Sequence, residues 1–289
     1  MAQVIATNTL SQLTQNNLDK SQKAQNQAIE RLSSGQRINS AKDDAAGLAI
    51  SDRMTSQVNG LKQANRNAND GMSMAQTAES ALGAVTDNLQ RVRELIVQAA
   101  NGTYTDEDRK SINNEIDARL QEVDRIGKDT TFNQKQLLGQ GDDASVAYNS
   151  SFTLQIGAFD GQTISLNLTD VRGVATALKG NTDYTSVGNK LINASGELQT
   201  DALKTVDAQI KSIDSVRSTL GAQQNRLQST VESNAATATN LSAARSQISD
   251  ADYAAEVSAM STAQILQQAG QNVLSQANAV PQNVLSLLK

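Results

Sequence analysis

Side chains able to do covalent or metal chemistry are scarce in this chain. Its 289 residues include no histidine and no cysteine, which excludes His/Cys metal sites, cysteine nucleophiles and Ser-His-Asp triads. The residue types needed for carboxylate-only or Ser-Lys catalysis are present. The adjacent acids Asp43 and Asp44 could suggest a metal site. Acids are favoured at a helix N-terminus in any case. We therefore predict a protein that is not an enzyme and holds no cofactor or metal.

The chemistry of the two ends is more informative, because both lack charge. Residues 1–18 and 257–288 contain no Asp, Glu, Lys or Arg, yet both are rich in Gln, Asn, Ser and Thr. A membrane span needs about 20 nearly unbroken apolar residues, so we predict no membrane insertion. Burying a charge is very costly, whereas an amide can be buried once it has hydrogen-bond partners. Uncharged amphipathic ends therefore predict burial against other copies of the same ends.

Apolar residues recur at helical spacing in both ends. The first helix is expected to stop at the loop signal Ser33-Ser34-Gly35, and the second to follow a break at Ser249-Asp250-Ala251-Asp252. We expect Pro281 to kink the second helix or to end a segment there. The residues predicted to form the interface between subunits are Ile5, Leu10, Leu13, Leu18, Val257, Met260, Ile265, Val273, Val280, Val284 and Leu288.

The elements between the ends are predicted from the period of their apolar residues. Over residues 54–99 this period is close to the 3.5 of a left-handed coiled coil, with Met72 among the seam residues, and Ser40-Ala-Lys-Asp43 resembles a capping box at the helix start. A shorter helical pattern follows at 112–126, and a second long pattern, matched in scale to the first, follows at 203–248. Gly60, Gly71 and Gly83 weaken the first helix unless packing compensates. Residues 152–156 and 162–168 alternate with period two around a turn, which predicts a β-hairpin. Residues 170–195 are predicted to be mainly loop.

The predicted fold is mainly α: a long antiparallel coiled-coil helical rod with a small β-hairpin insert and paired N- and C-terminal helices. We expect a terminal domain of residues 1–43 and 250–289, a rod domain of 44–140 and 191–249, and a variable insert of 141–190. A net charge of −5 and a pI near 4.9 disfavour nucleic acid as a partner. With aromatics at 2% of residues, paired helices are easier to build than a thick core.

Several short motifs stand in the two helical halves of the chain. They resemble those of bacterial flagellin, the subunit of the flagellar filament, over roughly residues 1–140 and 200–289. The motifs are Leu13-Thr-Gln-Asn-Asn-Leu18, Ile29-Glu-Arg-Leu-Ser-Ser-Gly35, Arg66-Asn-Ala-Asn-Asp-Gly71, Asp252-Tyr-Ala-Ala-Glu-Val257 and Val280-Pro-Gln-Asn-Val-Leu-Ser-Leu-Leu288.

The resemblance implies a homo-polymer whose terminal helices pack around a central channel. It also implies an extracellular location reached through the flagellar type III apparatus, and partners that include an export chaperone, the filament cap and the hook-junction proteins. No cleaved signal peptide is recognisable at the N-terminus. Only residues 141–190 separate the matching halves, so a short flagellin with little or no outer domain is expected.

The resemblance further implies a surface that binds the vertebrate Toll-like receptor that senses flagellin. The matching positions are Arg91, Leu95 and Glu115. Leu95 lies off the main seam and could be exposed, although it could instead widen the apolar stripe.

Two other classes of protein remain open at this point. A hook–filament junction protein would have terminal helices that pack in a similar way, and a non-assembling coiled-coil signalling rod would have similar long helices. A soluble rod should carry charge along its exposed length, however, which the ends lack.

Overall fold

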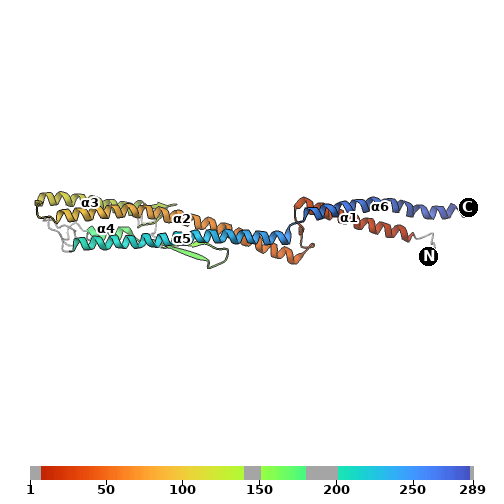
Figure 1. Ribbon diagram of the computed structural model, residues 1–289, viewed down its shortest axis with the longest axis horizontal. Helices are drawn as coiled ribbons and strands as arrows, with labels where there is room; N and C mark the ends of the chain where they lie inside the picture. The colour runs from red at the N-terminus through yellow and green to blue at the C-terminus, as the bar shows by residue number, and fades with distance from the viewer. Residues whose placement is uncertain (1–7, 140–150, 180–200, 287–289) are drawn as a thin grey trace. The chain divides into compact units, whose positions relative to one another are not determined.

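The computed structural model describes residues 8–139, 151–179 and 201–286, and these parts are predominantly helical (Figure 1). This confirms the predicted mainly α fold with paired terminal helices and a small hairpin. The elements are α1 (Thr9–Ser34), α2 (Ala45–Ala99), α3 (Asp106–Asp129), β1 (Thr131–Phe132), β2 (Lys135–Gln136), β3 (Ser151–Gln155), β4 (Thr163–Asn167), α4 (Val171–Lys179), α5 (Ala202–Ser249) and α6 (Tyr253–Ser286).

The chain divides into two compact units. The terminal unit comprises Met1–Val58 and Thr239–Lys289, and the central unit comprises Asn59–Ala238. Both divisions fall inside a long helix, α2 or α5. The three domains expected from the sequence stay a prediction.

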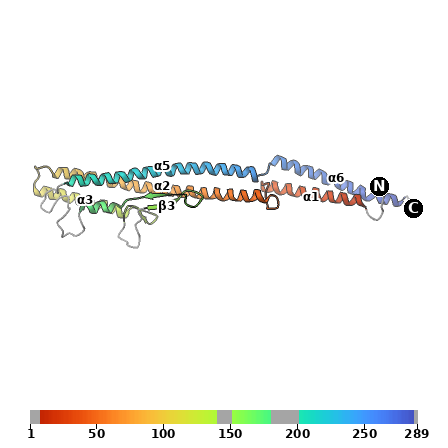
Figure 2. The same ribbon diagram turned by 90° about the horizontal axis from the view of Figure 1, so that it is seen from below.

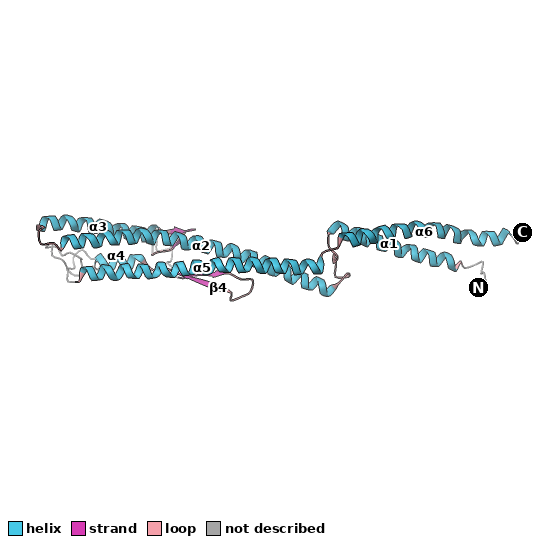
Figure 3. Cartoon of the chain, viewed as in Figure 1, coloured by secondary structure: helices cyan, strands magenta, loops and turns pink. Residues whose placement is uncertain are grey.

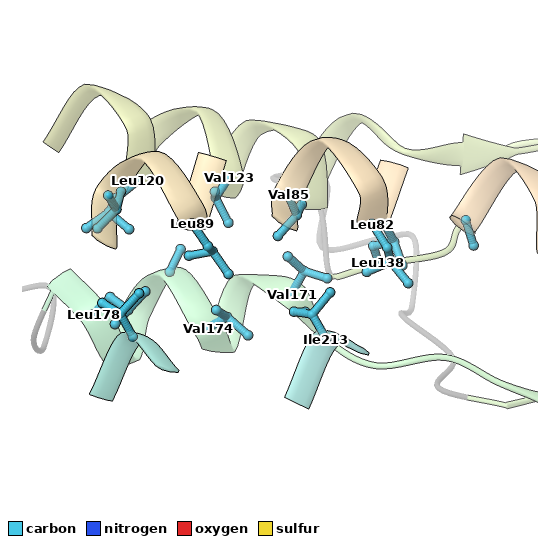
Figure 4. Packing of buried hydrophobic residues seen from close by; sticks show 14 of the residues in the cluster. Leu82, Val85, Leu89, Leu120, Val123, Leu138, Val171, Val174, Leu178 and Ile213 are labelled. Carbon is cyan, nitrogen blue, oxygen red and sulfur yellow. The ribbon is translucent and has the colours of Figure 1, made fainter. Parts of the chain in front are cut away.

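The core of the central unit is built by four helices. α3 and α5 both lie along α2 in the two views (Figures 1 and 2), and apolar side chains of α2, α3, α4 and α5 converge between them (Figure 4). Leu82 and Leu89 of α2, Leu120 of α3 and Ile213 of α5 are all completely or almost completely buried. The predicted seam of α2 is thus confirmed along most of its length, except that Met74 is buried where Met72 was expected.

Helix α4 corrects the prediction that residues 170–195 are mainly loop. Val171, Val174, Ala175 and Leu178 follow the spacing of one helical face, and each is at most 5% exposed. This short run includes Gly173 and three β-branched residues, so its intrinsic helix propensity is low. Packing against α2, α3 and α5 stabilises the helix instead, as Figure 4 shows. The remainder of the segment, residues 180–195, lies outside the described residues.

The predicted hairpin is confirmed as the antiparallel pair β3–β4 (Figure 3). Leu154 pairs with Ile164 and Phe152 with Leu166, so one face of the hairpin carries the apolar side chains. A Cβ at Gly60 of α2 would lie 2.9 Å from the Cβ of Ala158, and a Cβ at Gly71 would overlap Leu154. These two glycines therefore allow the hairpin to approach α2 closely.

Helix starts follow local hydrogen bonds. Thr105 caps α3 and forms a complete capping box with Asp108. The motif at residues 40–43 was wrongly predicted to start α2, because Asp43 accepts from the backbone and hydroxyl of Ser40 in a closed turn. The helix begins two residues later, where the Asp44 carboxylate accepts the Gly47 N–H at 2.9 Å.

Candidate assembly interface

The terminal unit is built around the antiparallel pair α1–α6. Asn8 donates to the carbonyl of Ala277 at 2.8 Å, and Arg31 forms an ion pair with Glu256 at 3.0 Å. Gln22 and Gln267 are hydrogen bonded between these two contacts. The partners of residues 8, 22 and 31 of the chain are residues 277, 267 and 256, so the residue number falls along α6 as it rises along α1. The two helices are therefore antiparallel. The predicted break before α6 is confirmed, since α5 ends at Ser249 and α6 begins at Tyr253.

Small side chains fill the seam between α1 and α6. Ser11, Thr14 and Ala28 of α1 and Ala263 and Ala277 of α6 are buried. Leu18 lies over Gly270, where an added Cβ would be 3.3 Å from the Leu18 Cδ1. Such a seam lets two helices approach closely, but it buries little apolar area per residue.

Large apolar side chains of these two helices, together with Ile50 of α2, are exposed. Ten large apolar residues are exposed among the described residues, and eight of them belong to the terminal unit. Both clusters of buried hydrophobic residues in the described parts lie in the central unit. The eight exposed residues, here called the terminal apolar set, are Leu10, Leu13, Ile29, Ile50, Tyr253, Ile265, Leu266 and Val273.

The residues predicted to form the interface fall into three groups. Leu10, Leu13, Ile265 and Val273 are exposed. Leu18, Val257 and Met260 are half-buried within the pair. Helix α6 does not end at Pro281, and it includes both Val280 and Val284. The side chains of these two valines lie outside the described parts of the chain. Ile5 and Leu288 lie wholly outside them.

The sequence reasoning missed four members of the terminal apolar set: Ile29, Ile50, Tyr253 and Leu266. Two of these stand directly beside another apolar residue of the same helix, as Ile29 follows Ala28 and Leu266 follows Ile265. Neighbours along a helix point about 100° apart, so one seam cannot bury both. Adjacent apolar pairs in a chain with few large side chains were therefore the available signal for a second apolar face.

A short backbone bridge joins the segments that lead into the terminal helices. Arg37 N–H donates to the Ser249 carbonyl at 2.7 Å, and Ala251 N–H donates to the Gly35 carbonyl at 3.0 Å. The Arg37 guanidinium also donates to the Ile248 carbonyl at 2.6 Å. This places a cation at the C-terminus of α5, where the helix dipole favours positive charge.

The three residues expected to bind the receptor are only partly brought to one surface. Arg91 Nε lies 3.1 Å from the Glu115 carboxylate and pairs with Glu94 at 3.0 Å, and all three side chains are exposed. Because Glu94 and Glu115 both stabilise the charged guanidinium, the pKa of Arg91 is raised. Leu95, which we expected could be exposed, is 1% exposed. It belongs to the central core, because α2 packs against more than one helix there.

Neither a metal centre nor a membrane span is found in the parts of the chain that the structure describes. No group of three or more Asp and Glu side chains is placed to hold a metal ion within residues 8–139, 151–179 and 201–286. No described helix combines the length and the apolar character that crossing a bilayer requires.

Comparison with known proteins identifies the family. The model of the bacterial flagellin N-terminal helical region matches residues 5–142, and that of the C-terminal helical region matches residues 203–288. The flagellin of Xenorhabdus nematophila is 46% identical, and flagellin 1 of Proteus mirabilis is 44% identical, each with all of both chains covered. A crystal structure of Bacillus cereus flagellin is 30% identical over 62% of this chain and 94% of that one, with a TM-score of 0.49. The chain belongs to the bacterial flagellin family.

Proposed function

We propose that the terminal apolar set is the surface through which subunits of this chain polymerise. Flagellins are structural subunits of the extracellular flagellar filament, which sets the broad function of this chain. The proposal that this set forms the interface is supported by the way α1 and α6 pack. Small side chains fill their mutual seam while Leu13, Ile265 and Val273 face outward. Large apolar faces that a single chain leaves uncovered are typical of interaction surfaces.

We further propose that residues near 1–40 and 250–289 are disordered in the free subunit and order on docking. Ordering one residue costs roughly 1–2 kcal/mol, and the seam of small residues offers little buried area to offset that cost. Burial against several neighbours can offset it. Subunits would then start filaments reluctantly, yet add readily to an existing end. Protection of both ends from protease in the free subunit would contradict this proposal.

Seeded growth tests the role of the ends. Short sheared filaments would be added to purified intact subunits and to subunits lacking residues 257–289, with growth followed by light scattering and electron microscopy. We expect growth of the intact chain alone. If both chains grew equally, or neither grew, the terminal helices would not be the polymerising elements.

The contact between subunits repeats head to tail, which gives an open helical filament rather than a closed ring. We propose that growth occurs at the distal end beneath a cap, after export through the flagellar type III apparatus with the help of a chaperone. Hook-junction proteins would join the base of the same filament. Incoming subunits whose ends are unfolded fit this route, since an unfolded chain can pass through a narrow channel. Rotation of such a filament would serve motility.

A second role is proposed at α2 and α3, as a ligand of the Toll-like receptor that senses flagellin. It is supported by the juxtaposition of exposed Arg91 and Glu115 across the two helices. Both side chains offer charge-assisted hydrogen bonds to a partner. Leu95 would contribute to receptor binding indirectly, because its packing in the core holds α2 in the position that presents Arg91.

Receptor activation in reporter cells tests this second role. We expect Arg91→Ala and Glu115→Ala each to reduce the potency of the free subunit at least tenfold, in line with interface residues at the centre of a contact. Arg93→Ala is the matched control, because Arg93 lies on the same helix and is also exposed and ion paired, with Asp207 at 2.6 Å. Equal potency of the Arg91, Glu115 and Arg93 variants and the parent chain would refute the assignment.

A further inference from the structure

Pro281 deprives one backbone carbonyl of α6 of its partner within the helix. Each carbonyl of an α-helix accepts the N–H of the residue four positions later, and the residue four after Ala277 is Pro281, which has no N–H. Pro281 is the only proline of the chain, and α6 continues beyond it to Ser286. Ala277 is 2% exposed, so its carbonyl needs a donor other than water.

The donor comes from the start of the other helix. Asn8 Nδ2 donates to the Ala277 carbonyl at 2.8 Å. The Oδ1 of the same side chain accepts the Ser11 N–H at 3.0 Å, which makes Asn8 the N-cap of α1. One amide therefore satisfies a free donor of α1 and a free acceptor of α6. An amide combines both capacities in a short side chain.

We propose that Asn8 sets the register of the α1–α6 pair by binding the carbonyl that Pro281 leaves free. The seam itself discriminates weakly between registers, because residues such as Ala28, Ala263 and Ala277 offer similar small surfaces. The other described polar contacts between the two helices join long side chains, Gln22 with Gln267 and Arg31 with Glu256, which tolerate small shifts. The Asn8 contact is short and ends on fixed backbone, and only one position of α6 lies four residues before a proline.

This inference rests on the proposed function, because register matters through the surface that neighbouring subunits cover. Leu10 and Leu13 follow Asn8 within the first turns of α1, while Val273 lies one turn before Ala277 on α6. Fixing Asn8 against Ala277 thus fixes the alignment of these exposed side chains from both helices. A slipped pair would present them in a different arrangement to the next subunit.

Two substitutions separate this role of Asn8 from its role as a cap. Asn8→Ser keeps a strong N-cap for α1, but its shorter side chain does not reach Ala277. Pro281→Ala supplies the missing N–H from within α6. Full-length chains with neither, either or both changes would be compared by the subunit concentration below which seeded filaments stop growing.

We expect Asn8→Ser to raise this critical concentration about five- to tenfold in the Pro281 chain, as loss of one hydrogen bond at a buried acceptor implies. In the Pro281→Ala chain we expect Asn8→Ser to raise the critical concentration about twofold or less, because the Ala277 carbonyl then has a partner in its own helix. A cap or a general structural role would give equal effects in both backgrounds, and that result would overturn the inference while leaving the proposed function intact. Failure of the unsubstituted chain to grow on seeds would contradict both.

Discussion

Gly60 and Gly83 lie on the same helix, but their surroundings predict opposite effects of adding a methyl group. A Cβ at Gly60 would lie 2.9 Å from the Cβ and 3.2 Å from the Cα of Ala158, neither of which can rotate away, whereas a Cβ at Gly83 would meet nothing within 4 Å. We expect Gly83→Ala to stabilise the protein by about 1 kcal/mol through helix propensity. We expect Gly60→Ala to destabilise it by about 1–3 kcal/mol through overpacking. Thermal unfolding followed by circular dichroism checks both, and equal effects would contradict this packing.

Leu95 provides a second test at the scale of one residue. Its side chain is 1% exposed within the central core, so Leu95→Ala should lower the free energy of unfolding by about 2–5 kcal/mol. Val97→Ala is the matched control, because Val97 is 49% exposed on the same helix. Denaturant titration of the free subunit measures both changes. A loss below about 0.5 kcal/mol for Leu95→Ala would show that Leu95 is exposed in solution.

These residues also show where sequence reasoning stops. The period of α2 correctly predicted buried Val92 and Ile96, but a single seam could not place Leu95, which is buried because two further helices lie against α2. Likewise, Gly60, Gly71 and Gly83 of α2 look alike in the sequence. The hairpin that lies against two of them comes from residues 151–167, whose position on α2 depends on tertiary packing.

At the scale of elements, we expect the stability of the start of helix α3 to depend on pH. The hydroxyl and N–H of Thr105 bond the Asp108 carboxylate and lower its pKa. A lowered pKa in the folded state stabilises the fold above the unfolded value, near 4, and this stabilisation disappears as the pH falls through the folded value. We therefore expect Asp108→Asn to be less stable than the parent chain at neutral pH, but to lose less stability on acidification from about pH 5 to pH 2.

Thermal denaturation across that range measures the effect of Asp108→Asn. Asp106→Asn, which neutralises another acid of the same first turn, controls for the loss of charge at the helix N-terminus. Identical pH dependence in the Asp108 variant and the parent chain would mean that the capping box does not form in solution.

Elements with strong periodic patterns were predictable, and one element stabilised by its neighbours was not. The alternation around β3 and β4 is a local signal, and the hairpin that it predicted is confirmed. Helix α4 has nine residues, which is too short to be stable alone. Its four buried apolar residues match a surface that exists only once α2, α3 and α5 have assembled.

At the scale of the whole molecule, the two units differ in where their apolar side chains lie. The central unit buries them in its own core, whereas the terminal unit exposes eight large ones. The absence of charge in residues 257–288 predicts burial of these ends against other copies, and this stays a prediction. It did not reveal that the seam would take the small residues and leave the large ones outside, since both sets follow helical spacing.

If subunits polymerise as proposed, the terminal apolar set becomes buried between them when the filament forms. The chain contains no cysteine, so a single Ile265→Cys substitution gives one thiol on a side chain position that is 65% exposed in the single chain. The rate of its reaction with a maleimide would be measured in the free subunit, in seeded filaments, and in denaturant as the reference for full exposure. We predict rapid reaction in the free subunit and at least tenfold slower reaction in filaments, as expected for a side chain removed from water by several neighbours. Equal rates in the free subunit and in the filament would contradict the claim, because Ile265 would then remain exposed after assembly.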